Sequence, residues 1–270
     1  MRTGEAYQRL PTGRVAAYAV AMHLRPFFYE PTACASYLFG CGSQRQLAVV
    51  DPHVDLVDAY LATAAELDRP ITAVFETHVQ ADHVSGLPAL VATTGATAYL
   101  PREVGVDFPH EEVGDGDEVE LGNTLVRVIG TPGHAPAHNA YSVADRRRGT
   151  DEPWLVFTGD SLLVGDVGRP DLHAKGDLTS EDLARLQHSS LARLLELPDY
   201  VIVYPSHYAG SVCARGLSGH PVSTIGFERL HNDALQPRDE DTFVAWSLEG
   251  QPEAPPGQAA IVAANRSGAA

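Results

Sequence analysis

Cysteine is scarce in this sequence. Its 270 residues include only three cysteines, at positions 34, 41 and 213, and no two of them have the Cys-x-x-Cys spacing of a thiolate metal site or a redox motif. Such an odd, widely spaced set does not make the disulfide framework of a small secreted domain. We therefore expect a reducing, cytoplasmic location and a fold that depends on its hydrophobic core, for which 44% hydrophobic residues are sufficient.

Positive charge is also scarce. There are 19 Lys and Arg residues against 35 Asp and Glu, which gives a formal net charge of -16 and a pI near 5.0. Nucleic acids and anionic membranes both attract clustered Lys and Arg. The one basic run, residues 146–148, precedes Gly149 and indicates a solvated loop. We therefore expect neither nucleic acid nor a membrane as a partner.

No apolar run approaches the length of a membrane span. The stretch 15–21 follows Arg14, is rich in alanine, and ends in Ala19-Val20-Ala21, which imitates the cleavage site of an export signal. Because this stretch is short, we interpret residues 1–21 as an N-terminal extension, with export as the alternative. Residues 22–270 show no linker and no short repeat, so we predict a single catalytic domain there.

Strand and helix patterns are present along the whole of this domain. Apolar runs and alternation predict strands over 22–29, 35–39, 46–50, 71–76, 97–100, 119–121, 124–129, 140–143, 154–157 and 200–204. Helical spacing predicts helices over 56–67, over 180–195 with Ser180 as N-cap, and over 225–230. It also predicts a short helix through Leu87, Leu90 and Val91 that stops at Gly95. The tail from Gly250, rich in Pro, Gly and Ala, is expected to lie extended over the surface. Two groups of strands flanked by helices predict an α/β fold, an αββα sandwich of two mixed sheets.

One short motif contains more potential metal ligands than any other. Thr77-His78-Val79-Gln80-Ala81-Asp82-His83 follows directly on the buried apolar run 71–75 and precedes Gly86. Histidine and aspartate side chains at a strand end are typical metal ligands, although a lone cluster of this kind could equally be structural.

The same arrangement recurs three times later in the chain. Apolar runs lead into Thr131-Pro132-Gly133-His134, into Thr158-Gly159-Asp160, and into Pro205-Ser206-His207. Sites of α/β sheets lie at the carboxyl ends of strands. Four strand-like runs that each end in a ligand-type side chain make chance a poor explanation, and we predict one site built from all of them.

These motifs resemble those of the metallo-β-lactamase superfamily, and more narrowly those of its persulfide dioxygenase branch. The narrower resemblance rests on residues 76–86, 157–163, 165–172 and 223–229 with Asn232. It implies one Fe(II) per chain, bound by His78, His134 and Asp160. It also implies a reaction of sulfur metabolism in which a low-molecular-weight thiol persulfide and O2 give sulfite and free thiol. Such a reaction is a step of hydrogen sulfide detoxification. The resemblance also favours a homodimer.

The ligand set that the resemblance implies agrees with the chemistry. Two imidazoles and one carboxylate on one face of an iron ion leave three coordination positions free, which is the arrangement of non-haem oxygenases. Substrate sulfur and dioxygen can then bind next to each other. We interpret His138, four residues after His134, as a neighbour of the pocket and not as a ligand.

One position departs from the family pattern. The zinc hydrolases and most dioxygenase relatives have a second histidine where this chain has Gln80. A neutral amide is a poor ligand for zinc or iron, so a two-zinc site would lose one ligand there, whereas the triad does not use this position. Gln80 therefore favours one metal ion over two, and its amide could hydrogen-bond to bound water or substrate.

Other residues are given secondary roles by the resemblance. Asp82, His83 and His207, together with Asp160, could form the superfamily's second metal site; in the dioxygenase branch they are implied to orient the ligands instead. Arg229 matches the family's carboxylate-binding arginine, and Arg169 lies in the loop beside the expected pocket. The histidines to which we assign no role are His23, His53, His110, His173, His188, His220 and His231.

Two further hypotheses stay open from the sequence. The first is a zinc-dependent thioester hydrolase of the glyoxalase II type, which would use a metal-bound hydroxide and need no oxygen. The second is a protein that binds a persulfide or a metal without turnover, with Gln80 as the mark of a lost activity.

Overall fold

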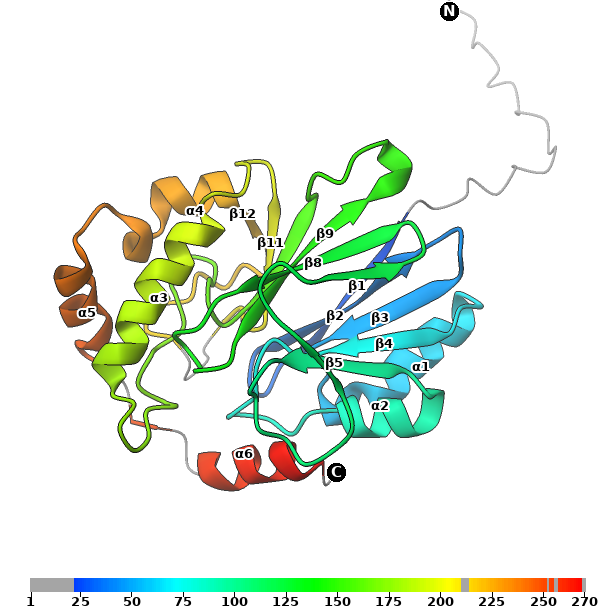
Figure 1. The fold of residues 1–270 in the computed structure, drawn as a ribbon, viewed down its shortest axis with the longest axis horizontal. Helices are drawn as coiled ribbons and strands as arrows, with labels where there is room; N and C mark the ends of the chain where they lie inside the picture. Colours follow the sequence, from blue (N-terminus) through cyan, green and yellow to red (C-terminus); the bar gives the residue numbers. More distant parts are fainter. Residues whose placement is uncertain (1–21, 210–213, 252, 255–256, 269–270) are drawn as a thin grey trace, which may run out of the picture.

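Two six-stranded sheets lie face to face at the centre of the molecule (Figure 1). The computed structural model describes residues 22–209, 214–251, 253–254 and 257–268; the predicted extension 1–21 and Cys213 lie outside them. The first sheet contains, in spatial order, β1 (Met22–Tyr29), β2 (Cys34–Cys41), β3 (Gln46–Val50), β4 (Ile71–Phe75), β5 (Thr97–Pro101) and β6 (Glu111–Val113). Strand β2 pairs in antiparallel orientation with both β1 and β3, whereas β3 to β6 pair in parallel, so the sheet is mixed.

The second sheet is also mixed. Its order is β12 (Ser223–Thr224), β11 (Ile202–Pro205), β10 (Leu155–Gly159), β9 (Asn139–Asp145), β8 (Thr124–Gly130) and β7 (Glu118–Leu121). Only β10 and β11 pair in parallel; the other neighbours are antiparallel. The neighbouring strands β7 and β8 form an antiparallel hairpin, with Gly122 in its turn at φ 63°.

Helices cover the outer face of each sheet. The first sheet carries α1 (Val57–Glu66), preceded by the 3-10 turn η1 (Val54–Leu56), and α2 (Leu87–Thr94). The second carries α3 (Ser180–Leu194), α4 (Ile225–His231) and α5 (Glu240–Leu248), with the 3-10 turns η2 (Arg146–Arg148) and η3 (Asp233–Leu235) in the connections. The four layers are thus helix, sheet, sheet and helix, which confirms the predicted αββα sandwich.

The hydrophobic core has one cluster for each interface between layers. Tyr37, Phe39, Phe75 and Phe157 lie between the two sheets, where their rings pack against one another. A second cluster fills the space between the first sheet and helices α1 and α2, and a third lies between the second sheet and helices α3 to α5. Because apolar side chains of both sheets are buried on both faces, the strands keep a fixed register and their ends are held in place.

Helix α3 begins one residue away from the expected cap. The predicted N-cap Ser180 is wrong, because the cap is Thr179, whose hydroxyl accepts from the backbone N–H of Asp182 while the Asp182 carboxylate accepts from the backbone N–H of Thr179. This reciprocal pair is a capping box.

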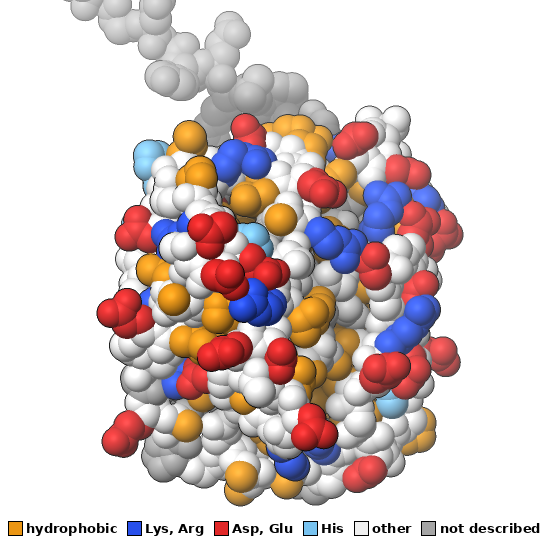
Figure 2. Space-filling model, turned by 60° about the vertical axis from the view of Figure 1, so that its left-hand side comes forward, with side chains coloured by type: hydrophobic (Ala, Val, Ile, Leu, Met, Phe, Trp, Pro, Cys, Tyr) orange, Lys and Arg blue, Asp and Glu red, His pale blue; other side chains and the backbone are white. Residues whose placement is uncertain are grey.

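The outside of helix α3 carries ion pairs. Arg185 pairs with Glu240 and Asp241 at the start of α5. Figure 2 shows acidic and basic side chains mixed over one face of the molecule.

The tail is not extended throughout. Residues 258–267 form helix α6 (Gln258–Ser267), which runs along the lower edge of the molecule in Figure 1. The prediction was wrong because Pro and Gly lie before this segment and, as Gly268, at its C-cap, whereas its own Ala-rich sequence favours a helix. Val262 packs against the core cluster under the first sheet. Among the described residues, no helix is long and apolar enough to cross a membrane.

Candidate metal centre

The carboxyl ends of β4, β8, β10 and β11 meet at one edge of the two sheets. The residues that follow these strands include His78, His134, Asp160 and His207, whose side chains are all at most 1% exposed. The rings of His78 and His134 are 5.0 Å apart between centroids, and His134 Nε2 lies 3.5 Å from Asp160 Oδ2. The structure therefore brings the three expected ligands into one buried group.

The tautomer of His78 is set by its neighbours. Its Nδ1 lies 2.9 Å from the hydroxyl of Thr77, and that hydroxyl donates to the carboxylate of Asp51 at 2.9 Å. Because Thr77 uses its own proton on Asp51, it accepts the Nδ1 proton of His78. The Nε2 lone pair of His78 is then the one available to a metal ion.

His134 is oriented in the same way by a backbone group. Its Nδ1 donates to the carbonyl oxygen of Arg169 at 2.9 Å, and its buried Nε2 has no hydrogen-bond partner. The close approach of the loop requires Gly168, since a Cβ atom there would lie 2.8 Å from His134 Nδ1 and 2.0 Å from the carbonyl oxygen of Asp160. A glycine at this position thus lets the loop hold the imidazole.

Asp160 uses one carboxylate oxygen and leaves the other free. Its Oδ1 accepts from His207 Nδ1 at 2.7 Å, whereas its buried Oδ2 has no hydrogen-bond partner. Burial opposes the charged form, but the nearby His207 ring outweighs burial and lowers the pKa of Asp160. The carboxyl is therefore ionised at neutral pH, as a metal ligand must be.

The donor set fits a divalent cation. The Nδ1 atoms of His78 and His134 each have a hydrogen-bond partner within the protein. The buried atoms His134 Nε2 and Asp160 Oδ2 have none and lie 3.5 Å apart. A buried polar atom without a partner is costly, so this pair of orphan atoms indicates a missing ligand. Burial also lowers the pKa of His78 and of His134, which keeps both rings neutral and able to bind metal.

His138 supports the group and is not a ligand in this arrangement. It stacks on His78 with ring centroids 4.9 Å apart, its Nδ1 lies 2.8 Å from the Thr131 hydroxyl, and its Nε2 accepts from the backbone N–H of Asp160. Both ring nitrogens of His138 are thus engaged by groups of the protein.

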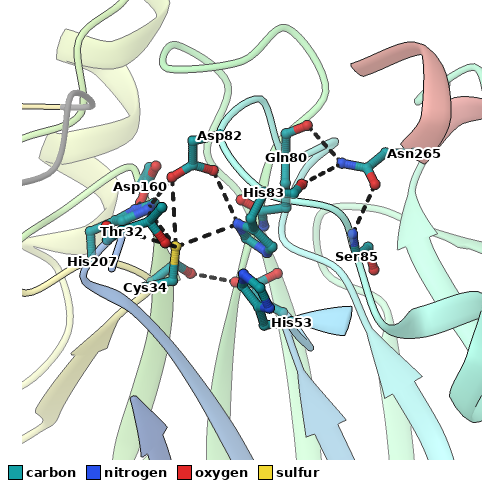
Figure 3. A network of polar contacts seen from close by, with 12 residues as sticks. Thr32, Cys34, His53, Gln80, Asp82, His83, Ser85, Asp160, His207 and Asn265 are labelled. Carbon is teal, nitrogen blue, oxygen red and sulfur yellow. Dashed lines mark hydrogen bonds and ion pairs between the residues drawn. The ribbon is translucent and has the colours of Figure 1, made fainter. Parts of the chain in front are cut away.

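A second group lies beside the first and is connected to it through His207. This imidazole also bonds Asp82 Oδ2 through Nε2 at 2.5 Å, and Asp82 Oδ1 lies 3.1 Å from His83 Nδ1 (Figure 3). Carboxylates accept and do not donate, so a His207 ring bonded to Asp82 and Asp160 carries a proton on each nitrogen. These residues therefore satisfy much of one another's hydrogen bonding, apart from His83 Nε2, which is buried without a partner.

Cys34 joins this second group, which the sequence did not predict. Its sulfur lies 3.3 Å from His207 Nε2, 3.5 Å from His83 Nδ1 and 3.7 Å from Asp82 Oδ2. Burial acts to raise the pKa of the thiol, but the His207 and His83 rings lower it to about 7. Cys34, Asp82 and His207 could hold an ion, since one potential ligand atom from each lies within 4.8 Å of the others. No sequence signal pointed to Cys34, because it begins a strand with no motif around it.

His173 is the other residue to which the sequence gave no role. It lies in the loop after β10, with its ring centroid 5.4 Å from that of His134 and 6.1 Å from that of His78. The signal that could have found it is its place shortly after Arg169, in a loop already assigned to the pocket.

The Gln80 side chain is buried, and neither its amide oxygen nor its amide nitrogen has a hydrogen-bond partner. Gln80 lines a cavity of about 20 Å³ together with His78 and Glu76, whose Oε2 is also unpartnered. A cavity of this size holds about one water molecule. The expected hydrogen bond of the amide to water or substrate stays a prediction.

The two arginines predicted to bind substrate lie in different places. Arg169 is buried beside the centre, where its guanidinium makes two bonds to the Asp171 carboxylate and its carbonyl oxygen accepts from His134. Arg229 is on α4, paired with Asp199 and donating to the carbonyl oxygen of Leu195 at the end of α3. None of these Arg229 contacts involves the histidine group.

An open pocket of about 460 Å³ reaches the histidine group at His173, whose ring lies 5.4 Å from that of His134. His173 forms part of its wall, and the opposite wall is α6. Two cationic side chains, Lys175 and Arg266, line it. A cavity of this volume is typical of small-molecule sites.

Comparison with known proteins agrees with this geometry. A model of the Metallo-beta-lactamase superfamily matches residues 29–207. The crystal structure of ETHE1 from Myxococcus xanthus superposes with a TM-score of 0.78 and 32% identity, covering 91% of this chain and 98% of that one.

Relatives with two different activities have similar levels of identity. Persulfide dioxygenase ETHE1 of Mus musculus mitochondria is 27% identical over 209 residues, which is 77% of this chain and 74% of the relative. A hydroxyacylglutathione hydrolase of Methylobacterium sp. (strain 4-46) is 32% identical over 151 residues, 55% of this chain and 53% of the relative. These relatives identify a superfamily and do not separate its branches.

Proposed function

We propose that this chain, which belongs to the metallo-beta-lactamase superfamily, is an iron-dependent persulfide dioxygenase that oxidises a low-molecular-weight thiol persulfide to sulfite and free thiol. Among its relatives, the murine persulfide dioxygenase is similar over 77% of the chain and the hydrolase over 55%. The observation that carries the proposal is the pair of orphan ligand atoms, His134 Nε2 and Asp160 Oδ2, beside His78.

One ion per chain suits the hydrogen bonding around Asp160. Only Asp160 Oδ2 faces the histidines without a partner, whereas Oδ1 is held by His207. In the second group, His207 and His83 both bond Asp82, so that these side chains form a charged support for the first group. A carboxylate anchored in this way keeps its orientation when the ion binds.

His78, His134 and Asp160 would hold the ion, and Fe(II) supplies the binding and reduction of dioxygen next to the substrate sulfur. The chain fixes each ligand by a second contact: Thr77 for His78, the Arg169 carbonyl for His134, and His207 for Asp160. The overall reaction consumes one persulfide, one O2 and one water. It adds both dioxygen atoms to the terminal sulfur, splits the S–S bond by hydrolysis, and gives thiol, sulfite and two protons.

The substrate's anionic end has a cationic pocket within reach of the centre. Lys175 and Arg266 line the pocket whose wall includes His173, the ring of which lies 5.4 Å from that of His134, and either cation can pair with a carboxylate. Arg229, the residue suggested by the resemblance, is tied to Asp199 and Leu195 instead. We therefore include Lys175 and Arg266 in the proposed substrate site. Their positive charge favours the persulfide of a small anionic thiol as substrate.

An oxygen-electrode experiment tests the proposal. Protein loaded anaerobically with Fe(II) should consume O2 only when glutathione persulfide or cysteine persulfide is added, with one sulfite formed per O2. His78→Ala should abolish this uptake, and His188→Ala, which changes a histidine on α3 outside the group, should retain it. Absence of persulfide-dependent uptake by the iron-loaded protein would refute the proposal.

A zinc-dependent thioester hydrolase is the second candidate. It is favoured by the grouping of Cys34, Asp82 and His207, whose ligand atoms lie close enough to hold a further ion, and by the similar hydrolase from Methylobacterium. This function predicts hydrolysis of S-lactoylglutathione without oxygen and activity that follows zinc content. Elemental analysis after expression with both metals available, paired with aerobic and anaerobic assays, distinguishes the two candidates.

A further inference from the structure

A third imidazole faces the centre from outside the expected ligand set. One ring nitrogen of each of His78, His134 and His173 lies within 4.8 Å of the others. The Nε2 atom of His173 is buried and has no hydrogen-bond partner, as is also true of His134 Nε2 and Asp160 Oδ2. Three buried polar atoms from three segments thus lack protein partners around the His134 ring, and one shared ligand would satisfy them together.

The position of His173 is built into the fold. Its loop begins at Gly168, whose N–H donates to the Asp160 carbonyl, and Arg169 then accepts from His134. Gln187 of α3 donates to the Gly168 carbonyl oxygen, and Gln258 of α6 donates to the carbonyl oxygen of Leu172, next to His173. The loop is thus attached to two ligands and to two helices on either side of His173.

We propose that His173 is a fourth protein ligand of the metal centre, so that the ion is held by three imidazoles and one carboxylate. The inference rests on the metal centre of the proposed function and extends its ligand set. Burial lowers the pKa of His173 to about 3, so the ring is neutral at physiological pH and offers a lone pair.

A fourth ligand has a consequence for the substrate. With His173 as a further ligand, a six-coordinate ion would have two positions left for substrate sulfur and dioxygen instead of three. His173 also lines the pocket with Lys175 and Arg266, so a molecule in that pocket contacts a metal ligand directly. The loop therefore links occupancy of the pocket to the coordination of the ion.

Metal binding without substrate or oxygen tests this inference. The wild-type chain and the His173→Ala and His173→Gln variants are freed of metal and titrated with Co(II) and with Fe(II) under nitrogen, against a competing chelator. We expect both variants to bind about tenfold or more weakly than wild type, within the range reported for loss of a residue that supports a metal. Leu172→Ala, a change to the preceding residue in the same loop, is the matched control and should bind as wild type does.

The number of bound imidazoles gives a second readout. Proton NMR of the Co(II) form should show shifted ring signals from three histidines in wild type and from two in His173→Gln. Equal affinity and an unchanged set of signals would overturn the inference. Thermal unfolding of the metal-free variants checks folding; if the alanine variant does not fold, the glutamine variant, which fills the same space, decides the matter.

The outcome for His173 is separate from that for the dioxygenase. Weaker binding by the variants together with no oxygen uptake by wild type would retain the ligand and reject the reaction. Metal binding by the variants as tight as that of the wild type, together with persulfide-dependent oxygen uptake, would reject His173 as a ligand and retain the dioxygenase reaction.

Discussion

The side-chain amide of Asn265 donates to the backbone carbonyl oxygen of His83 at 2.9 Å, across 182 positions of the sequence. The same amide nitrogen donates to the carbonyl oxygen of Gln80 at 2.9 Å, and its oxygen accepts from the backbone N–H of Ser85 at 2.8 Å. Figure 3 shows these contacts converging on the loop that follows β4. One residue of the last helix therefore fixes the backbone of the ligand-bearing loop.

Asn265→Asp is expected to weaken both stability and metal binding. The carboxylate keeps an acceptor for Ser85 but loses both donors and places oxygens against the carbonyl groups of Gln80 and His83. Loss of such buried bonds costs roughly 1 to 3 kcal/mol. Urea unfolding and Fe(II) titration measure the two effects. Ser267→Ala, which removes a bond from the Ser267 hydroxyl to the Ala264 carbonyl oxygen within the same helix, is the control. Equal metal affinities in all three proteins would contradict the expectation.

Gln80→His is expected to raise the affinity for zinc and to reduce persulfide-dependent oxygen uptake. An imidazole at a buried position whose amide has no partner supplies an additional ligand, and every extra ligand takes a position that substrate or dioxygen needs. We expect zinc affinity to rise by about tenfold or more. Competition with a chelator and an oxygen electrode provide the measurements. A strong gain of oxygen uptake would instead identify the natural site as degenerate.

Cys34 is expected to ionise near neutral pH in the metal-free protein. Although burial opposes the thiolate, His207 and His83 bring the pKa of this thiol to about 7. Thiolate absorbance near 240 nm should therefore rise with a midpoint close to pH 7 in a variant whose other two cysteines are replaced by serine. Adding Cys34→Ser should remove the signal, and a midpoint above pH 9 would contradict the prediction.

The metal-free protein is expected to lose stability as the pH falls below 6.5. Burial lowers the pKa of His138 to about 3 in the folded state, so between pH 6.5 and 3 the unfolded state binds the proton first. Each histidine of this kind lowers the free energy of unfolding by about 1.4 kcal/mol for every pH unit of acidification in this range. The depressed pKa of Asp82, caused by His207 and His83 against the effect of burial, adds a loss below about pH 4.

Replacement of His138 by glutamine tests this window. Between pH 6 and 4, the unfolding free energy of His138→Gln should depend less steeply on pH than that of the wild type. The difference in slope should be about 1.4 kcal/mol per pH unit, which corresponds to one proton. His83 acts in the opposite direction: burial opposes its charge, but Asp82 raises its pKa, so its stabilisation is present below pH 6.5 and is lost as the pH rises through the raised value. Identical slopes for wild type and His138→Gln would show that His138 is not buried as a neutral ring.

The sequence predicted the elements whose patterns are strong. Strands β1 and β3 have the predicted bounds, because each is followed by a strong stop signal, Glu30-Pro31 after β1 and Asp51-Pro52 after β3. The strands β6 and β12 were missed, since three and two residues are too few for a period to appear. Helix α6 was missed because the proline-rich residues before it determined the interpretation of the tail.

The position of the site was predictable, but its full membership was not. Strand ends bring His78, His134, Asp160 and His207 together, and a ligand-type residue after an apolar run is visible in the sequence. Cys34 stands at the start of a strand, and its proximity to His207 depends on how the two sheets stack. Neither that stacking nor the path of the loop that carries His173 leaves a local pattern.

Helix α6 also bears on the order of events during synthesis. His78, His134 and Asp160 emerge from the ribosome well before Asn265, so a growing chain has every one of these ligands while the loop after β4 still lacks its anchor. Domains generally fold as units, so a contact made by a late segment is absent until that segment has been synthesised. A chain that stops before Asn265 would therefore carry His78, His134 and Asp160 but would lack the hydrogen bonds that anchor the loop after β4.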